Sequence, residues 1–221
     1  MMSNFAAARL AMVDGQLRPN KVTDMAVIQA FLDVPRERFV PDALRGAAYI
    51  DEDLPVGGGR YLMEPMLFAR MLQIATIRPG DVVLEIGAGT GYGTAILAKL
   101  TDRAVSVESD PALAARAREM LTKLGLDRAA TVIDGPLERG YPERAPYDAI
   151  LFSGAVGEIP EAITAQLADG GRLLAVVKEG GVGIGKAVLM LRANGVVSRR
   201  VAFDAATPLL PGFVPQPGFV F

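Results

Sequence analysis

From Asp81 to the C-terminus, short apolar runs alternate with stretches in which apolar residues recur every three or four positions. Runs of the first kind, rich in β-branched residues, predict buried strands, and stretches of the second kind predict helices with one apolar face. The predicted strands cover residues 82–86, 104–108, 131–133, 147–152 and 173–177. The predicted helices cover residues 92–100 and 111–124, and a third runs from near Pro160 to Asp169-Gly170-Gly171. Strands joined by helices at this spacing predict βαβ crossovers and a mainly parallel sheet.

The last two apolar runs, residues 187–191 and 196–203, are too close together for a crossover helix. They predict an antiparallel hairpin that closes one edge of the sheet. The glycine-rich segment Glu179 to Gly185 is expected to be a surface loop. The final segment, Pro208 to Phe221, is rich in proline and aromatic residues and is expected to pack against the core, the alternatives being a cover for the sheet edge or for an acceptor groove.

The first 80 residues follow a different order, with two predicted helices and a glycine-rich connection. One helix is expected to be capped by Thr23 and to end at Pro35, and the other opens at Glu64-Pro65. The connection contains Gly57-Gly58-Gly59, which permits either close approach of the backbone to a ligand or a tight turn. The sequence therefore predicts one domain, residues 1–221, in which a helical N-terminal lid with a substrate loop (1–80) precedes an α/β cofactor-binding core (81–221).

Composition removes several kinds of chemistry. The chain has no Cys and no His, which excludes disulfides, a thiolate nucleophile, a Ser-His-Asp triad and the usual zinc or haem ligands, so no metal site is predicted. The formal net charge of −2 gives no basic footprint for nucleic acid or an anionic membrane. With no apolar run of membrane-spanning length and no leader-like N-terminus, a cytoplasmic location is expected.

The strongest motif is a glycine turn between a predicted strand and a predicted helix: Glu85-Ile-Gly87-Ala88-Gly89-Thr-Gly91. A dinucleotide-binding turn would need glycine where Tyr92 stands, and Glu85 would repel a pyrophosphate but suit an ammonium group.

Two further acids follow the next predicted strands. Glu108 comes about 20 residues after the turn, where a carboxylate can accept hydrogen bonds from ribose hydroxyls. Asp134, followed by Gly135, can reach an adenine amino group. An adenosine with a cationic amino-acid tail and no phosphate is S-adenosylmethionine, which we predict as the cofactor.

The chain resembles the protein-L-isoaspartate O-methyltransferase family over most of its length. The resemblance rests on the glycine motif and on residues 13–17, 34–41, 48–51, 54–57, 134–135, 145–148 and 166–173. It implies a Rossmann-like class I methyltransferase fold, with a seven-stranded mainly parallel sheet, a C-terminal antiparallel hairpin and an N-terminal helical extension. It also implies cofactor contacts near Glu85, Gly87, Glu108 and Asp134, and methylation of the carboxylates of damaged aspartyl residues in proteins, leaving S-adenosylhomocysteine.

The substrate loop departs from the family pattern. Where the family reads Thr-Ile-Ser-Gln-Pro, this chain reads Tyr61-Leu-Met63-Glu64-Pro, so the serine hydroxyl that holds the acceptor carboxylate is missing. Loss of a hydrogen bond to a charged group costs roughly 1.5–3 kcal/mol, and an ionised Glu64 about 6 Å from the acceptor would add repulsion of roughly 3 kcal/mol. Arg60 by its charge, Tyr61 by its hydroxyl, or Ser153 beyond the fourth predicted strand could compensate.

Three functional hypotheses follow from this loop. The chain is an isoaspartyl carboxyl methyltransferase with an altered loop, or a methyltransferase of the same scaffold with another protein, peptide or small-molecule acceptor, for which Glu64 could be a general base. The third hypothesis is a catalytically silent module that binds S-adenosylmethionine. A carboxylate acceptor is already ionised near neutral pH, so the absence of His is no obstacle to the first hypothesis. The sequence does not specify an oligomeric state.

Overall fold

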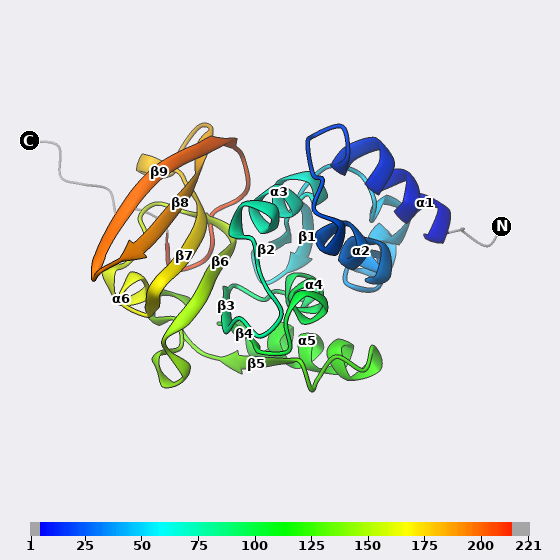
Figure 1. Cartoon of the computed structure of the whole chain (residues 1–221). Coiled ribbons are helices and arrows are strands. Elements are labelled where there is room, and N and C mark those ends of the chain that lie inside the picture. The colour runs from blue at the N-terminus through cyan, green and yellow to red at the C-terminus, as the bar shows by residue number, and fades with distance from the viewer. Residues whose placement is uncertain (1–4, 214–221) are drawn as a thin grey trace, which may run out of the picture.

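A computed structural model of the chain describes residues 5–213 and contains a seven-stranded sheet in the order β5-β4-β3-β6-β7-β8-β9 (Figure 1). The strands are β3 (Val83–Ile86), β4 (Ala104–Glu108), β5 (Ala130–Asp134), β6 (Tyr147–Val156), β7 (Leu167–Val177), β8 (Gly185–Ala193) and β9 (Val196–Ala205). The pairs from β5 to β7 are parallel, whereas β7–β8 and β8–β9 are antiparallel. The predicted parallel sheet and the hairpin at its edge are both confirmed.

Helices connect the parallel strands as the periodicity predicts, with one exception. The connecting helices are α4 (Tyr92–Leu100), α5 (Pro111–Lys123) and α6 (Glu161–Thr164). Asp110 caps α5 by accepting hydrogen bonds from the backbone amides of Ala112 and Leu113, and Pro111 occupies its first turn.

The exception is the helix between Pro160 and Asp169, for which the predicted length was wrong, because α6 ends at Thr164. After one turn of helix the chain already enters β7 at Leu167, whose neighbour Gln166 accepts a hydrogen bond from the Tyr147 backbone amide at 2.8 Å. Two glycines allow β7 to continue alongside β6 through an irregularity in the strand register. Gly170 has a φ of +79°, and the backbone of Gly171 lies too close to the Tyr147 carbonyl to leave room for a Cβ. The two glycines therefore bend a strand here and do not end a helix.

The N-terminal region packs helices and a hairpin beside this sheet. Its elements are α1 (Phe5–Met12), a π-helical turn (Val13–Leu17), α2 (Met25–Asp33), 3₁₀ turns at Arg36–Arg38 and Asp42–Ala47, the antiparallel pair β1 (Leu54–Gly57) and β2 (Arg60–Leu62), and α3 (Pro65–Ala75). The cap of α2 is Asp24 and not the predicted Thr23, because the Asp24 carboxylate accepts from the amides of Ala26 and Val27. Gly58 and Gly59 join β1 to β2, which confirms the tight turn expected at the three glycines, although the two strands beside it were not predicted.

The two faces of the sheet bury separate apolar clusters. Leu84, Ile86, Val105 and Val107 belong to one cluster, and the residues between them in β3 and β4 face the other, which includes α2, α3 and α4. Because side chains alternate along a strand, Glu85, Ser106 and Glu108 all point to this second face. Two carboxylates that the sequence assigns to the cofactor are thus on the face covered by the N-terminal helices.

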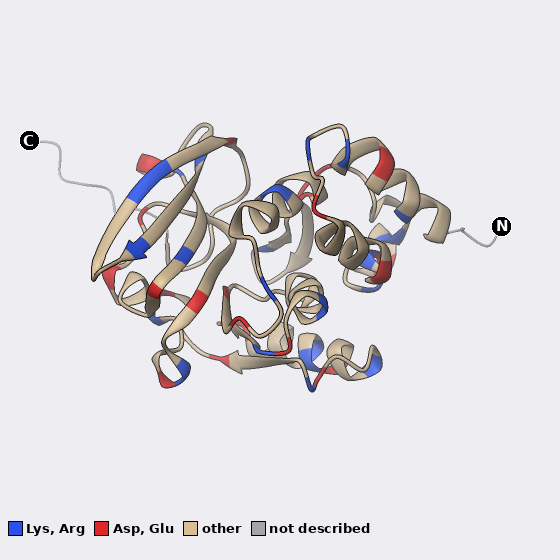
Figure 2. Ribbon diagram, in the orientation of Figure 1, with Lys and Arg blue, Asp and Glu red and all other residues tan. Residues whose placement is uncertain are grey.

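The remaining segments close the molecule. Residues 179–184 of the predicted loop lie at the surface, whereas Gly185 is buried and begins β8. Leu210 and Phe213 are buried against β6, which confirms core packing for the described part of the C-terminal segment. The rest of that prediction, residues 214–221, lies outside the described residues. Acidic and basic residues are interspersed along the ribbon (Figure 2). No helix within residues 5–213 is long and apolar enough to cross a bilayer.

Candidate active site

The glycine turn between β3 and α4 forms the floor of the candidate site. Gly87, Gly89 and Gly91 have φ of +90°, +55° and +91°, a region that side chains rarely adopt. The amides of Gly87 and Ala88 both donate to the carbonyl of Val107, at 2.9 and 3.0 Å, which holds the turn against β4. The predicted motif therefore forms a backbone surface that a ligand can approach closely.

Glu85 lies beneath this turn, fully buried, and its carboxylate is surrounded by hydroxyl groups. Thr94 and Ser106 each donate to Oε2 at 2.6 Å, and Ser153 donates to Oε1 at 2.6 Å. Burial raises the pKa of Glu85, and the three hydrogen bonds oppose that effect. Gly93 in α4 passes so close that a Cβ there would lie 2.0 Å from Oε1. Ser153, considered as a substitute acceptor hydroxyl, is thus bonded to Glu85.

A small cavity opens beside Glu85. It has about 20 Å³ of free space, roughly enough for one water molecule. Its lining comes from the glycine turn, the substrate loop and helices α3 and α4: Tyr61, Leu62, Met63, Phe68, Glu85, Gly87, Ala88, Gly89, Thr90, Tyr92, Gly93 and Ser153.

Glu108, at the end of β4, is fully buried, and its carboxylate accepts four hydrogen bonds from Arg60 and backbone amides, besides a longer one from Ser109 Oγ at 3.4 Å. Its Oε2 accepts from the Gly89 amide at 2.6 Å and from Arg60 Nε at 3.3 Å. Its Oε1 accepts from the amides of Ser109 and Asp110, at 2.9 and 3.1 Å. The Arg60 side chain is only 2% exposed, and its Nη2 donates to the Gly87 carbonyl at 2.8 Å. The guanidinium predicted to face the acceptor is therefore bound at the predicted ribose site.

Asp134 ends the neighbouring strand β5 at a second, larger opening. Its half-exposed carboxylate forms an ion pair with Arg118 of α5, at 3.1 Å. This cavity, about 200 Å³, is lined by Val107, Ile133, Asp134, Gly135, Pro136, Arg139, Gly140, Tyr141, Pro142 and Glu143. Of the predicted cofactor residues, Glu85, Gly87, Ala88 and Gly89 line the first cavity, and Asp134 and Gly135 line the second. Glu108 connects the two groups, because its carboxylate accepts from the Gly89 amide and its carbonyl accepts from the Gly135 amide. Gly91 lines neither cavity and packs against Ala117 of α5.

The substrate loop brings Met63 into the small cavity and leaves Tyr61 at the surface. Met63 is buried, and its side chain lines the cavity with no donor to offer. Tyr61 is 40% exposed, so its hydroxyl is accessible to an acceptor. Its position next to both Arg60 and Met63 makes it the accessible polar group of this part of the loop.

Glu64 lies at the start of α3 among other carboxylates. Its backbone amide donates to Asp53 Oδ1 at 3.1 Å, and Asp51 accepts from the nearby Met66 amide. Burial, with smaller contributions from Asp51 and Asp53, raises the pKa of Glu64 to about 7, although Arg36 opposes the shift. Near neutral pH this side chain is therefore present in both its neutral and its ionised form.

Arg36 is the site residue that sequence reasoning missed. It is fully buried, donates to the carbonyls of Ala48 and Met63 at 2.7 and 2.9 Å, and lies 4.9 Å from the centre of the Tyr92 ring. Burial lowers its pKa. Its hydrogen bond to the Met63 carbonyl holds the backbone of the substrate loop in place. Nothing near Arg36 in the sequence indicates this role, because it is followed by the charged residues Glu37 and Arg38 and its partners Ala48 and Met63 are remote along the chain.

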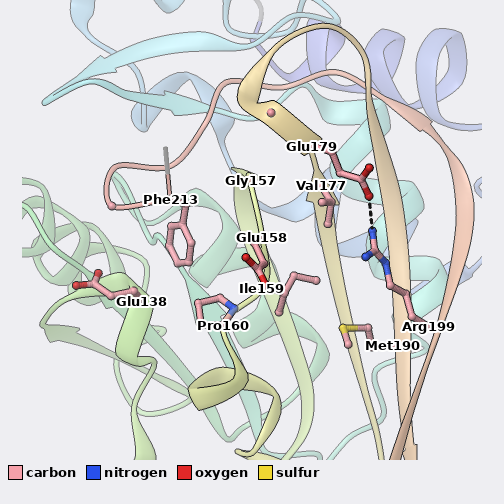
Figure 3. A pocket seen from close by; sticks show the side chains of 12 residues that line it. Glu138, Gly157, Glu158, Ile159, Pro160, Val177, Glu179, Met190, Arg199 and Phe213 are labelled. Atoms are coloured by element: carbon pink, nitrogen blue, oxygen red, sulfur yellow. Dashed lines mark ion pairs between the residues drawn. The ribbon is translucent and has the colours of Figure 1, made fainter. Parts of the chain in front are cut away.

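A larger cavity, with a volume of about 700 Å³, lies elsewhere, beyond the carboxyl ends of β6 and β7 (Figure 3). Figure 3 shows Glu179 and Arg199 joined across one wall, at 3.5 Å. None of the predicted site residues lines this cavity. Its lining is Glu138, Gly157, Glu158, Ile159, Pro160, Val177, Glu179, Gly180, Met190, Arg199, Gly212 and Phe213.

Comparison with known proteins gives one consistent family. Residues 9–201 match the family model described as protein-L-isoaspartate(D-aspartate) O-methyltransferase. A protein-L-isoaspartate O-methyltransferase of Methylorubrum extorquens (strain PA1) is 45% identical over 210 residues, which cover 94% of this chain and 90% of that protein.

Solved structures agree with this result. A protein-L-isoaspartate O-methyltransferase superposes with a TM-score of 0.81 at 27% identity, covering 93% of this chain and 67% of that one. A second structure, titled a putative enzyme of this kind from Plasmodium falciparum in complex with S-adenosyl-L-homocysteine, has a TM-score of 0.77 at 20% identity, covers 94% of this chain and 98% of that one, and shows the shared fold.

Proposed function

This chain belongs to the protein-L-isoaspartate(D-aspartate) O-methyltransferase family, and we propose that it methylates isoaspartyl carboxylates through the site built around Glu85 and the Arg60–Glu64 loop. It is an S-adenosylmethionine-dependent O-methyltransferase that acts on protein substrates. The family assignment favours the first of the three sequence hypotheses over another acceptor or a silent binding module. As part of the same proposal, residues 1–221 form one cytoplasmic methyltransferase domain, supported by an apolar cluster shared between both parts of the chain.

The chemical types of the residues around the glycine turn are those that S-adenosylmethionine requires. Glu85 is a fully buried carboxylate that makes no ion pair within the described residues, and the charge of Arg60 lowers its pKa by less than any of its three hydroxyl hydrogen bonds does. A buried anion with so little compensation from a cation is unfavourable. We assign it to the ammonium group of the cofactor. The backbone of the turn at Gly87, Ala88 and Gly89 lines the cavity beside Glu85 and provides the close surface, and Glu108 is assigned to the ribose hydroxyls. This buried and unpaired carboxylate is the observation that carries the proposal.

The second cavity is assigned to the adenine. Asp134 and Gly135 line it, and the apolar side chains of Val107 and Ile133 form one of its walls. When bound, S-adenosylmethionine supplies a sulfonium-activated methyl group and leaves as S-adenosylhomocysteine.

The acceptor side needs no general base, because a carboxylate is ionised near neutral pH. The residues of the loop have to orient one acceptor oxygen and exclude water. Tyr61 offers an accessible hydroxyl. We assign Glu64, in its neutral form, to donate a hydrogen bond to the acceptor, as the amide of glutamine would. The pKa near 7 makes that form available and removes the repulsion expected of a fully ionised Glu64.

The direct test is methyl transfer from labelled S-adenosylmethionine to an isoaspartyl peptide, with the matching aspartyl peptide as blank. We expect the wild type to methylate only the isoaspartyl peptide. Met63→Ser and Met63→Ala form a matched pair, since both open the same space and only one supplies a hydroxyl. We expect a kcat/KM roughly tenfold to a hundredfold higher for Met63→Ser than for Met63→Ala, from one added charged hydrogen bond. A wild type that binds S-adenosylhomocysteine but leaves the isoaspartyl peptide unmethylated would refute the proposed acceptor.

A further inference from the structure

Arg60 occupies a place that the cofactor needs. Its Nε is 3.3 Å from Glu108 Oε2 and its Nη2 is 2.8 Å from the Gly87 carbonyl oxygen. A Cβ built on Gly87 would lie 2.4 Å from Nη2, so the guanidinium rests directly on the glycine turn. The backbone surface that a ligand should approach is therefore covered by a side chain of the substrate loop.

Space and hydrogen-bonding capacity lead to the same conclusion. The cavities beside Glu85 and Asp134 have about 20 and 200 Å³, whereas pockets for ligands of this size have about 300–1,000 Å³. Glu108 Oε2 already accepts two hydrogen bonds, and Oε1 accepts three. A ribose can bond to Glu108 and join the two cavities only if Arg60 leaves.

A displaced guanidinium needs another anion. Arg60 is almost fully buried, and a buried cation that loses its partner is strongly destabilised. It also borders a narrow gap, too small for a water molecule, together with Tyr61, Ser153 and Thr207. An acceptor carboxylate bound at Tyr61 would supply the negative charge that Glu108 no longer offers.

We propose that Arg60 is a cofactor-operated switch: it pairs with Glu108 in the free enzyme, is displaced by the cofactor ribose, and then binds the acceptor carboxylate. The acceptor half of this inference rests on the proposed function, and the Glu108 half does not. The switch makes binding ordered, because the acceptor's cationic partner becomes available only after the cofactor is bound. Arg60 is thus assigned to specificity for an anionic acceptor in a loop that lacks the serine hydroxyl.

The first test is the affinity for S-adenosylhomocysteine, measured by isothermal titration calorimetry on the wild type, Arg60→Ala and Arg60→Met. When only a fraction of molecules can bind, the apparent Kd rises by the inverse of that fraction. If fewer than about one molecule in ten has Arg60 displaced, both variants should bind about tenfold tighter or more. Arg45→Ala is the matched control and should bind as the wild type does, since Arg45 is exposed and pairs only with exposed Asp42.

Unchanged or weaker binding by both Arg60 variants would overturn the switch, because the arginine would then assist the cofactor. The two variants differ in the volume that they leave, so Arg60→Met keeps the test valid if Arg60→Ala does not fold. Thermal unfolding provides a second readout. Addition of S-adenosylhomocysteine should raise the Tm of the Arg60 variants by more than that of the wild type.

The second test is the affinity for a fluorescent isoaspartyl peptide, measured by anisotropy with and without S-adenosylhomocysteine. We expect the wild type to bind the peptide tightly only with S-adenosylhomocysteine present, and Arg60→Ala to lose this enhancement. Equal wild-type binding in both conditions would overturn the switch. The peptide could bind in neither condition while the Arg60 variants still bind S-adenosylhomocysteine more tightly. That result would support the displacement of Arg60 from Glu108 by the cofactor and would refute the isoaspartyl carboxylate as the acceptor.

Discussion

Replacement of Glu64 by glutamine should remove a pH dependence from methyl transfer. The wild-type side chain is half-buried near Asp51 and Asp53, and its pKa is raised to about 7. Below that pH the side chain is neutral and can donate a hydrogen bond to the acceptor carboxylate. Above it the side chain is ionised, cannot donate, and repels the acceptor. Activity on the isoaspartyl peptide should therefore fall as the pH rises through 7.

The magnitude follows from the fraction of neutral Glu64. One pH unit below the pKa about 90% of the side chain is protonated, and one unit above about 10% is. If only the neutral form binds the acceptor productively, kcat/KM should fall by about tenfold between pH 6 and pH 8. The acceptor carboxyl has a pKa near 4 and stays ionised throughout this range.

The assay is the initial rate of methyl transfer at limiting peptide, from pH 5.5 to 8.5 at constant ionic strength. Glu64→Gln keeps a donor at every pH, so its profile should be flat and should match the wild type near pH 6. Arg36 also faces Glu64 but stays protonated across this range, so it adds no step. Affinity for S-adenosylhomocysteine, measured at both ends of the range, serves as the control for cofactor binding.

A wild-type rate that rises as the pH increases through 7 would refute the proposed role of neutral Glu64, because the ionised side chain would then be the active form. The proposed role would equally be refuted if Glu64→Gln kept the wild-type profile. In either case the acceptor is not held by a neutral Glu64.

Three further predictions concern the cofactor site and the core. Glu85→Gln should weaken binding of S-adenosylhomocysteine roughly tenfold to a hundredfold by calorimetry, because a charged hydrogen bond contributes about 1.5–3 kcal/mol; unchanged affinity would exclude the ammonium role. Gly93→Ala should also weaken that binding, since its Cβ would meet the Glu85 carboxylate at 2.0 Å, whereas Gly15→Ala, with open space around its Cβ, should not. Phe31→Ala should lower the free energy of unfolding by roughly 3–5 kcal/mol in urea titrations, because the ring is fully buried against Tyr92; a loss below 1 kcal/mol would contradict its place in the core.

The sequence alone determined the elements whose evidence is local. The glycine turn, the buried strands before and after it, and the antiparallel hairpin all follow from φ preferences and from the period of apolar residues within one segment. Glu85 could be assigned because its neighbours in the chain, Gly87 and Gly89, define the kind of ligand that a carboxylate there can meet. Where a local signal had two meanings, the prediction failed, as at Gly170-Gly171, which bend a strand instead of ending a helix.

The tertiary structure decided the partners of the charged groups. Glu85 accepts hydrogen bonds from the hydroxyls of Thr94, Ser106 and Ser153. Arg60 forms an ion pair with Glu108, and the members of each set lie in separate elements. The periodicity of apolar residues does not predict these hydrogen-bond and ion-pair partners, because they come together only when the helices and strands pack. The raised pKa of Glu64 has the same origin, since burial and neighbouring carboxylates exist only in the folded chain. The sequence could therefore predict the glycine turn, whereas only the fold shows which charged groups are paired and which have a shifted pKa.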